Sequence, residues 1–188
     1  FRYLKDLSPD PESCRGRVHD LLSGYEDLND LLSLEIDGVR VGRNVLSKTV
    51  RGFRVGRLDN DDPAHRAAVA EHLCRSLAAT EGARKLMDEG AFKAAFFCER
   101  GYTPAGEVFD VCILAGIDAI QWTGAPMDGT LLFKRYGFAN RAMHSLALSD
   151  LSWRAACAMP WGEQQDVQIL DQLRSHYRSG AWYNRQQL

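Results

Sequence analysis

One stretch, AFKAAFFCERGYTPAGEVFDVCILAGIDAIQWTG, constrains the fold of this chain more than any other. Its apolar run Ala94–Cys98 is typical of a strand covered on both faces in a parallel sheet. Thr103-Pro104 predicts the start of a helix and Gly116 predicts its end. Ile117–Trp122 is a second apolar run. A strand, a helix and a strand within about 30 residues predict a βαβ unit, whose two strands are parallel.

The segment before this unit is mostly helical in pattern. Asp10-Pro11 and Asp62-Pro63 each place an N-cap acid before a proline, which is tolerated at the first helical position. The second pair opens a long helix over Ala64–Glu89 with one apolar face. Between the two starts, Leu34–Val41 predicts a small strand or hairpin, followed by a short helix over Asn44–Arg51.

The segment after the unit predicts a third strand over Leu131–Tyr136, a helix from the N-cap Ser149 to about Met159, and a tail helix over Glu163–Arg178. Together these elements predict an α/β fold: a three-layer, Rossmann-like domain with a mostly parallel sheet and a helix-rich N-terminal half. We expect residues 1–188 to form this single domain, with residues 1–60 as a helical lead-in.

Composition narrows the class of protein. The 188 residues carry 23 Lys plus Arg and 25 Asp plus Glu, and this balance disfavours nucleic acid as a partner. No apolar run reaches the roughly 20 residues of a membrane span, so we expect no transmembrane segment. The five cysteines are scattered without a CxxC spacing, which favours a reducing, cytoplasmic location. Cys98 and Cys112 are expected to be buried packing residues.

The loop after the first strand of the unit is a candidate site, because ligands of open α/β sheets bind beyond the carboxyl ends of the strands. Glu99 is a candidate general base, Arg100 a candidate partner for an anionic group, and Tyr102 a platform for a sugar ring. The alternative is that these residues form a surface ion pair and a tyrosine that anchors the loop.

Several common sites are excluded by motif. The string ERGYTPAG lacks the glycines of a dinucleotide fingerprint, and no phosphate-binding P-loop motif occurs. Asp59-Asn60-Asp61 resembles a metal-binding DxD motif, but it precedes a helix, and we interpret it as a solvated loop with Asp62 as the cap. No His, Cys or nucleophile spacing indicates a zinc site or a hydrolase. We therefore expect no metal and no cofactor.

A second candidate segment, residues 133–144, combines cations and aromatic side chains with an amide and a histidine. Lys134 and Arg135 are suited to sugar hydroxyls and acidic groups, and His144 is a second candidate base. The alternative is a basic, solvated strand edge with a structural histidine.

The order of ERGYTPAGEVFDVCILAGIDAIQW, DGTLLFKRY, NRAMHS and DLSW resembles bacterial capsular and surface-polysaccharide biosynthesis proteins of the glycosyltransferase B type. The upstream LEIDGVRVGRNVLSKTVR is similar to an element of the same family. The resemblance implies the N-terminal, acceptor-side domain of a two-domain transferase. It also implies that the nucleotide sugar is bound mainly by a second domain beyond Leu188.

The site positions that the resemblance implies are Glu99, Arg100, Tyr102, Trp122, Thr123, Lys134, Arg135 and His144. Glu99-Arg100-Gly101 departs from the family pattern, so the identity of the base stays open between Glu99 and His144. We therefore expect a glycosyltransferase domain that joins a sugar from a nucleotide-sugar donor to a carbohydrate acceptor. The alternative is a non-catalytic carbohydrate-binding or scaffolding module, because a fold does not fix a function.

Overall fold

The computed structural model describes residues 3–125 and 129–179. The chain divides into two compact units. Unit 1 comprises Phe1–Trp122 with Lys134–Arg141, and unit 2 comprises Thr123–Phe133 with Ala142–Leu188. Among the described residues, no helix is both long and apolar enough to cross a membrane.

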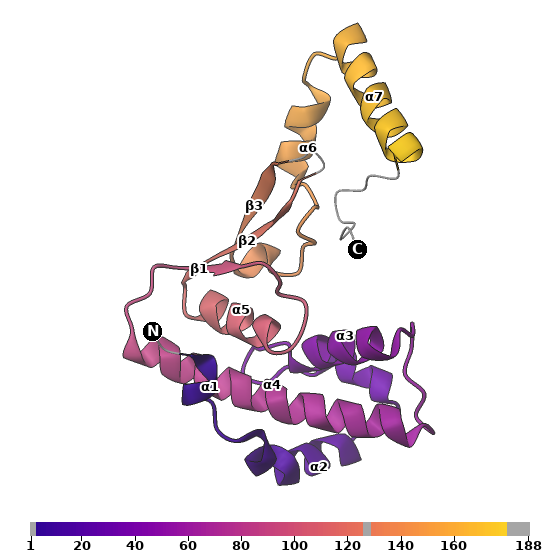
Figure 1. The fold of residues 1–188 in the computed structure, drawn as a ribbon. Helices are drawn as coiled ribbons and strands as arrows, with labels where there is room; N and C mark the ends of the chain where they lie inside the picture. The colour runs from indigo at the N-terminus through magenta and orange to yellow at the C-terminus, as the bar shows by residue number, and fades with distance from the viewer. Residues whose placement is uncertain (1–2, 126–128, 180–188) are drawn as a thin grey trace. The chain divides into compact units, whose positions relative to one another are not determined.

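Unit 1 begins with helices, as predicted. They are α1 (Leu4–Leu7), the 3₁₀ helix η1 (Pro11–Cys14), α2 (Arg15–Ser23), the 3₁₀ helix η2 (Leu28–Ser33), α3 (Val41–Phe53) and α4 (Pro63–Glu89) (Figure 1). The start at Asp10-Pro11 is confirmed, although its first turn is 3₁₀ before α2 begins. The start at Asp62-Pro63 is also confirmed, because the Asp62 carboxylate accepts from the Ala64 N–H at 2.8 Å.

Of the small strand or hairpin predicted over Leu34–Val41, the structure has only a minimal hairpin, in which the N–H groups of Ile36 and Val39 each donate to the other's carbonyl. The chain forms only one antiparallel bridge there, between Ile36 and Val39. Asp37 and Gly38 between them have φ values of 49° and 80°, which make a tight turn in place of an extended strand. The helix that follows therefore starts at Val41, earlier than predicted.

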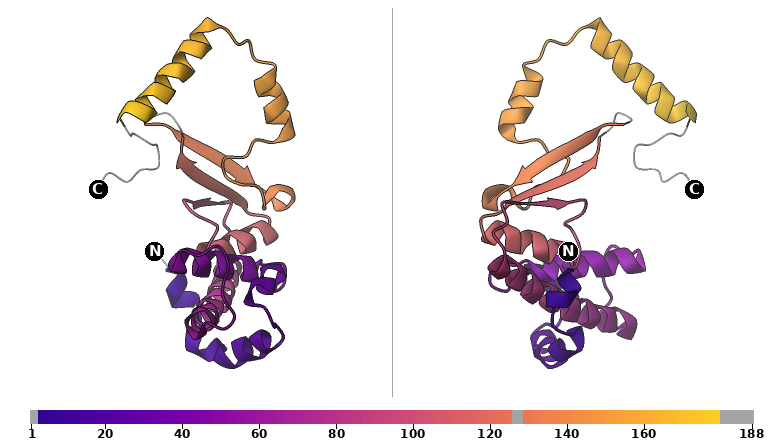
Figure 2. Two further views of the ribbon diagram at one scale, coloured as in Figure 1. Left: turned by 90° about the vertical axis from the view of Figure 1, so that its right-hand side faces the viewer. Right: turned by 60° about the vertical axis from the view of Figure 1, so that its left-hand side comes forward.

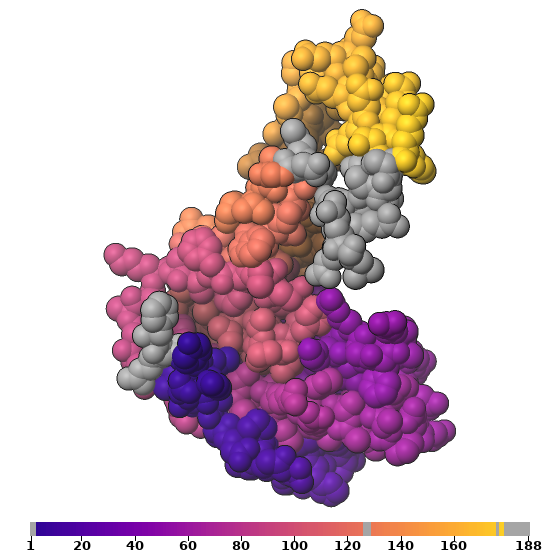
Figure 3. All heavy atoms as spheres, in the orientation of Figure 1, coloured from indigo at the N-terminus to yellow at the C-terminus, as the bar shows by residue number. Residues whose placement is uncertain are grey.

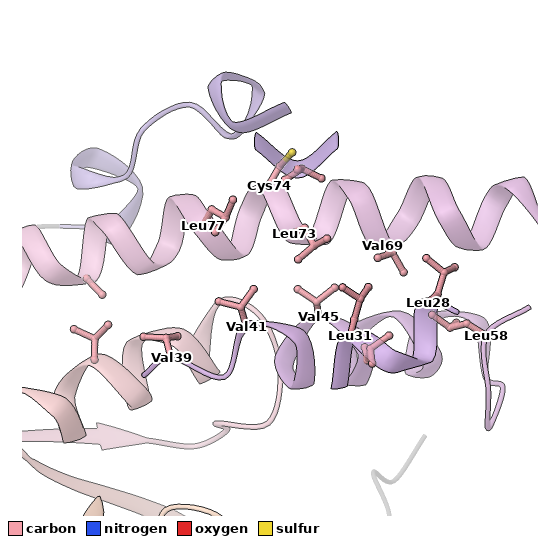
Figure 4. Packing of buried hydrophobic residues seen from close by; sticks show 14 residues of the cluster. Leu28, Leu31, Val39, Val41, Val45, Leu58, Val69, Leu73, Cys74 and Leu77 are labelled. Atoms are coloured by element: carbon pink, nitrogen blue, oxygen red, sulfur yellow. The ribbon is translucent and has the colours of Figure 1, made fainter. Parts of the chain in front are cut away.

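The hydrophobic core of unit 1 lies between α4 and the elements that pack beside it (Figure 4). Val41 and Val45 of α3 face Leu73 of α4, and all three are 0% exposed. In both views of Figure 2, α5 (Ala105–Leu114) lies between these helices and the first strand. Most of the apolar side of α3 is therefore buried inside the unit, whereas Phe53 at its end is 39% exposed.

The βαβ unit is confirmed: β1 (Ala94–Phe97), α5 and β2 (Asp118–Gly124) follow one another, and Gly116 ends the helix with a φ of 72°. β1 and β2 are parallel, with Phe97 opposite Gln121.

The third strand, β3 (Leu131–Tyr136), is also found as predicted, in the order β1-β2-β3. The sheet is small and mixed, however, so the predicted mostly parallel sheet is not found, and a Rossmann-like fold is not established. The physical reason is the connection: β3 follows β2 after a few residues, and so short a link joins antiparallel strands, because a parallel pair needs a longer crossover.

The prediction that β1 is covered on both faces is wrong. Phe97 is 8% exposed and packs edge-on against Phe109 of α5, whereas Phe96 is 66% exposed. Cys98 is exposed rather than buried, because it follows the end of the strand. Cys112 is buried as expected, and burial raises the pKa of its thiol to about 11, so it is not a thiolate at neutral pH.

Unit 2 contains α6 (Asp150–Cys157) and α7 (Glu163–Ser179), close to the predicted ranges. Ser149 caps α6 as predicted, because its hydroxyl accepts from the Ser152 N–H at 3.1 Å. The apolar side chains of α7 do not form a core among the described residues, since Val167, Leu170, Leu173 and Tyr177 are all exposed.

Candidate functional site

The loop after β1 holds the first three predicted site residues. The Glu99 carboxylate is exposed, and its Oε1 accepts from the N–H groups of Arg100 and Gly101 at 2.7 and 2.8 Å. These bonds hold the carboxylate at the start of the loop that follows β1, beyond the carboxyl end of the strand. The prediction that Glu99 acts as a base stays a prediction.

The Arg100 guanidinium is held by neutral acceptors. It donates to Gln121 Oε1 at 2.9 Å, to the Arg141 carbonyl at 2.9 Å and to the Tyr136 hydroxyl at 3.1 Å. It also lies 4.1 Å from the centre of the Tyr136 ring and 4.9 Å from that of Phe109. This arrangement fixes the position of a positive charge beside the end of β1.

A buried ion pair that was not predicted from the sequence lies next to Arg100. Arg40 contacts Asp110 of α5 through two guanidinium nitrogens, Nε at 3.0 Å and Nη2 at 2.6 Å, while its backbone N–H donates to the same carboxylate at 3.0 Å. Arg40 Nη1 also donates to the Arg141 carbonyl at 3.4 Å. Because Arg100 uses the same carbonyl, two guanidinium groups meet at one oxygen atom.

A second missed group is Glu107, which is 0% exposed. Its Oε1 accepts from Ser76 at 2.6 Å and from Thr103 at 2.8 Å, whereas its Oε2 has no hydrogen-bond partner. Burial is the main cause that raises the pKa of this carboxyl, and the hydrogen bonds from Ser76 and Thr103 oppose the rise. Asn44 lies close by, with a buried Nδ2 that also lacks a partner. The signal available in the sequence was a pair of acids, Glu107 and Asp110, spaced to share one face of a helix.

Tyr102 is held against α3. Arg51 Nη1 donates to its hydroxyl at 2.6 Å, and the Arg51 guanidinium lies 4.8 Å from the centre of its ring. A shallow hollow of about 590 Å³ lies beside the pair, lined by Ser47, Val50, Arg51, Arg54, Val55 and Tyr102. The tyrosine is therefore both an anchor of its loop and one wall of an open hollow.

The predicted residues of β2 and β3 divide between the two faces of the sheet. Lys134 lies 5.6 Å from the Tyr136 ring centre, and partial burial, followed by the nearby charge of Arg100, lowers the pKa of its ammonium group. Arg135 is instead exposed, and its hydrogen bond to Asp118 raises the pKa of the guanidinium. Trp122 is 41% exposed beside the buried Gln121, and side chains of successive residues alternate across a strand. Trp122 therefore lies on the opposite face of the sheet from Gln121, which accepts a hydrogen bond from Arg100.

Two predicted residues belong to unit 2. Thr123 is half-buried in β2, and His144 is exposed, with its Nδ1 accepting from the Leu146 N–H at 3.2 Å. Of the predicted set, the structure thus brings Arg100 and Lys134 together and places Glu99 and Tyr102 in the same loop as Arg100. Arg135 and Trp122 are separate from this group.

The loop Asp59-Asn60-Asp61 is held by its own side chains. Asn60 Oδ1 accepts from the Leu28 N–H at 2.8 Å, and Asp59 Oδ1 accepts from the Asp61 N–H at 2.9 Å, so both side chains stabilise the loop. Within residues 3–125 and 129–179, no group of three or more His, Cys, Asp or Glu side chains is placed to hold a metal ion.

A larger groove, of about 980 Å³, lies elsewhere in unit 1 between α2 and α4. Apolar residues such as Val18, Leu22 and Ala70 line it together with cations and carboxylates. None of the predicted site residues lines this groove.

Comparison with models of known families, with curated proteins and with solved structures finds no match for this chain.

Proposed function

We propose that this chain is a glycosyltransferase domain of surface-polysaccharide biosynthesis and that it binds the carbohydrate acceptor. In the proposed reaction, an acceptor hydroxyl forms a bond to the anomeric carbon of a nucleotide-activated sugar. The bond from that carbon to the nucleotide phosphate breaks, and the nucleotide leaves. The hydroxyl proton goes to a carboxylate or a histidine, with Glu99 as the first candidate and His144 as the second.

One observation carries this proposal: Glu99, Arg100 and Tyr102 follow β1 directly, at the carboxyl end of the parallel pair β1–β2. Ligands of α/β sheets bind at this edge. The loop offers a carboxylate, a fixed guanidinium and a phenol within four residues. Carboxylates and phenols bind sugar hydroxyls, and aromatic rings pack against sugar rings, so the residue types suit a carbohydrate.

A second candidate function is a carbohydrate-binding module without catalysis. The observation in its favour is that Glu99 is exposed and already accepts two backbone hydrogen bonds. A general base is normally tuned by burial or by a charged neighbour. Burial raises the pKa of the Glu107 carboxyl, but this side chain is 0% exposed and so does not reach a ligand directly.

The test is sugar transfer by the protein that contains this chain, with Glu99→Gln and His144→Gln compared at saturating donor. Loss of a general base lowers turnover by roughly 10²- to 10⁴-fold with little change in melting temperature. Glu71→Gln, which changes an exposed glutamate of α4, is the matched control and should retain activity. If both test variants keep near-normal turnover while acceptor binding persists, the binding module is the correct function.

A further inference from the structure

The segment 38–58, which contains α3, has an unusual charge. It carries six cations and no acidic residue, whereas the whole chain has a formal net charge of −2. The cations are Arg40, Arg43, Lys48, Arg51, Arg54 and Arg57. Positive charges without acidic neighbours on one helix and its flanks require either ion pairs with other parts of the chain or a ligand.

The structure accounts for two of the six. Arg40 pairs with the buried Asp110, and Arg57 pairs with Asp27. The other four, Arg43, Lys48, Arg51 and Arg54, make no ion pair with any residue in the described part of the chain.

Three cations of α4 have carboxylate partners. Arg75 pairs with Glu71 and Lys85 with Glu81, each one helical turn away, and Arg84 pairs with Asp37. Arg66 of α4 makes no ion pair within the described residues, so the two segments differ in degree: four of the six cations around α3 lack a carboxylate partner.

Two of the four unpaired cations lie on one side of α3, and a third follows its end. Arg43 and Arg51 are eight residues apart, which places them within about a quarter turn of each other on a helix with 3.6 residues per turn. Arg54 follows Phe53, the last residue of α3, with a left-handed φ of 57°. Val41 and Val45 occupy the opposite, buried side. In Figure 3 the side chains of α3, coloured purple, form part of the outer surface. The apolar side of α3 is packed in the core except for Phe53 at its end, which is 39% exposed, so this helix has no continuous apolar face for insertion into a lipid surface.

The hollow beside Tyr102 lies on this charged face. Arg51 and Arg54 line it together with the hydroxyl-bearing Ser47 and the apolar Val50 and Val55. Arg51 is held in position by its bond to the Tyr102 hydroxyl. A guanidinium presents paired donors that match a carboxylate or a phosphate, and an ionised acceptor strengthens such hydrogen bonds. The remaining lining suits the hydroxyls and the C–H face of a sugar ring.

We infer that the α3 face, with the hollow lined by Arg51, Arg54 and Tyr102, recognises an acidic glycan through a carboxylate or phosphate group on one of its sugars. This inference rests on the proposed function, because it names the class of carbohydrate that the acceptor belongs to.

The experiment measures binding by calorimetry at low salt with the complete 188-residue chain. The probes are a galacturonic acid tetramer, its methyl ester as the neutral match, glucose 6-phosphate with glucose as its neutral match, and a thymidine decanucleotide. We expect the acidic tetramer to bind at least about tenfold more tightly than its ester, because charge-assisted hydrogen bonds are lost in the ester. The two acidic probes distinguish a carboxylate from a phosphate as the recognised group.

The test variant is Arg51→Gln with Arg54→Gln, and the matched control is Arg66→Gln with Arg75→Gln on α4, which removes the same charge. The test variant should lose about tenfold or more in affinity for the acidic probe, and the control should stay within about twofold. Arg54→Gln alone keeps the bond between Arg51 and Tyr102 and should give an intermediate loss. Circular dichroism melting checks that each variant is folded.

Three results would overturn the inference, and they separate it from the proposed function. Equal binding of acidic and neutral tetramers, unchanged in the test variant, would refute the acidic specificity and leave carbohydrate binding intact. Binding of no carbohydrate at all would refute both. Oligonucleotide binding as tight as that of the acidic tetramer would identify a general polyanion surface. A fourth result, lower stability of the test variant with unchanged affinity, would assign Arg51 and Arg54 to the C-terminal end of the α3 dipole alone.

Discussion

Helix α3 contacts two of its neighbouring helices, α4 and α5, by different chemistry. Toward α4 it presents Val41 and Val45, which meet Leu73 in an apolar interface. Toward α5, the chain at the start of α3 presents Arg40, which pairs with the buried Asp110. The first interface stabilises by removing apolar area from water and tolerates changes of shape. The second adds little net stability, but it fixes the orientation of α5. Loss of either partner is strongly destabilising, because it leaves the other charge buried and unpaired.

The difference also explains where the candidate site lies. α5 connects β1 to β2, so the contacts that orient α5 also orient the loop that carries Glu99 and Arg100. The Arg141 carbonyl accepts from both Arg40 and Arg100, and thereby links the buried ion pair to this loop. A polar interface is suited to this task because its hydrogen bonds are directional.

Asp110→Ala should have the largest effect on stability. It leaves the Arg40 charge buried without its carboxylate, and we expect a loss of about 3–5 kcal/mol in the free energy of unfolding. Urea denaturation measures this loss. The double variant Arg40→Met with Asp110→Leu removes both charges and should recover most of the stability. If the double variant is as unstable as Asp110→Ala, the ion pair is essential for folding rather than for orientation.

Leu73→Ala tests the apolar interface between α3 and α4. Leu73 is 0% exposed, and its truncation leaves a cavity, so we expect a loss of about 2–5 kcal/mol. Leu73→Met conserves volume and should cost less than about 1.5 kcal/mol, which distinguishes this interface from the polar one. Equal losses for the alanine and methionine variants would show that the apolar interface is as specific in shape as the polar one.

Glu107→Gln tests the buried polar face of α5 through pH. Burial raises the pKa of the Glu107 carboxyl in the folded chain, so its contribution to stability is fully present at pH values below the unfolded pKa. That contribution is lost as pH rises through the folded pKa, because the unfolded state releases the proton first. The glutamine variant removes this loss and should be more stable than the parent at neutral pH by about 1–3 kcal/mol, with no gain in acid.

Thermal unfolding of the parent and Glu107→Gln over a pH series from acid to neutral measures this difference. Glu71→Gln is the exposed control, and its curve of stability against pH should run parallel to that of the parent. A Glu107→Gln curve parallel to that of the parent would mean that Glu107 is ionised in the folded chain.

Lys85→Gln should have the smallest effect. It breaks an exposed pair with Glu81 one turn earlier on α4, and such pairs contribute about 0.3–0.5 kcal/mol. The melting temperature should therefore change by only a degree or two in a domain of this size. A loss of stability comparable to that of Asp110→Ala would show that a solvent-exposed ion pair of this protein matters as much as the buried one.

Sequence patterns located most of the elements but not their environment. Prolines and caps predicted the start of α4 at Pro63, and the glycine rule predicted the end of α5 at Gly116. The apolar run Ala94–Cys98 predicted a strand correctly and its burial incorrectly. A short apolar run does not show whether one face of the strand is covered or both. The pattern gives the type of each residue and not the layers that pack on the strand.

For the candidate site, too, the sequence predicted where residues lie but not which partners they contact. The position of Glu99 and Arg100 beyond β1 followed from the βαβ pattern, because the carboxyl end of a strand is defined by its neighbours in sequence. The partners of Arg100 did not follow, since Gln121, Tyr136 and Arg141 come from separate parts of the chain. The basic segment around α3 was visible in the sequence, but only the ion pairs of the folded chain show which of its cations lack a carboxylate.

The sequence by itself determined the local features of this protein: where helices start and end, and the order strand, helix, strand. These depend on hydrogen bonds and dihedral angles within a few residues, which the residue types nearly fix. Only the tertiary structure decided that Arg40 meets Asp110, 70 residues away, and that Glu107 is enclosed beside Ser76. The physical reason is that a buried charge is tolerated only beside the right partner, and that partner is supplied by packing rather than by neighbouring residues.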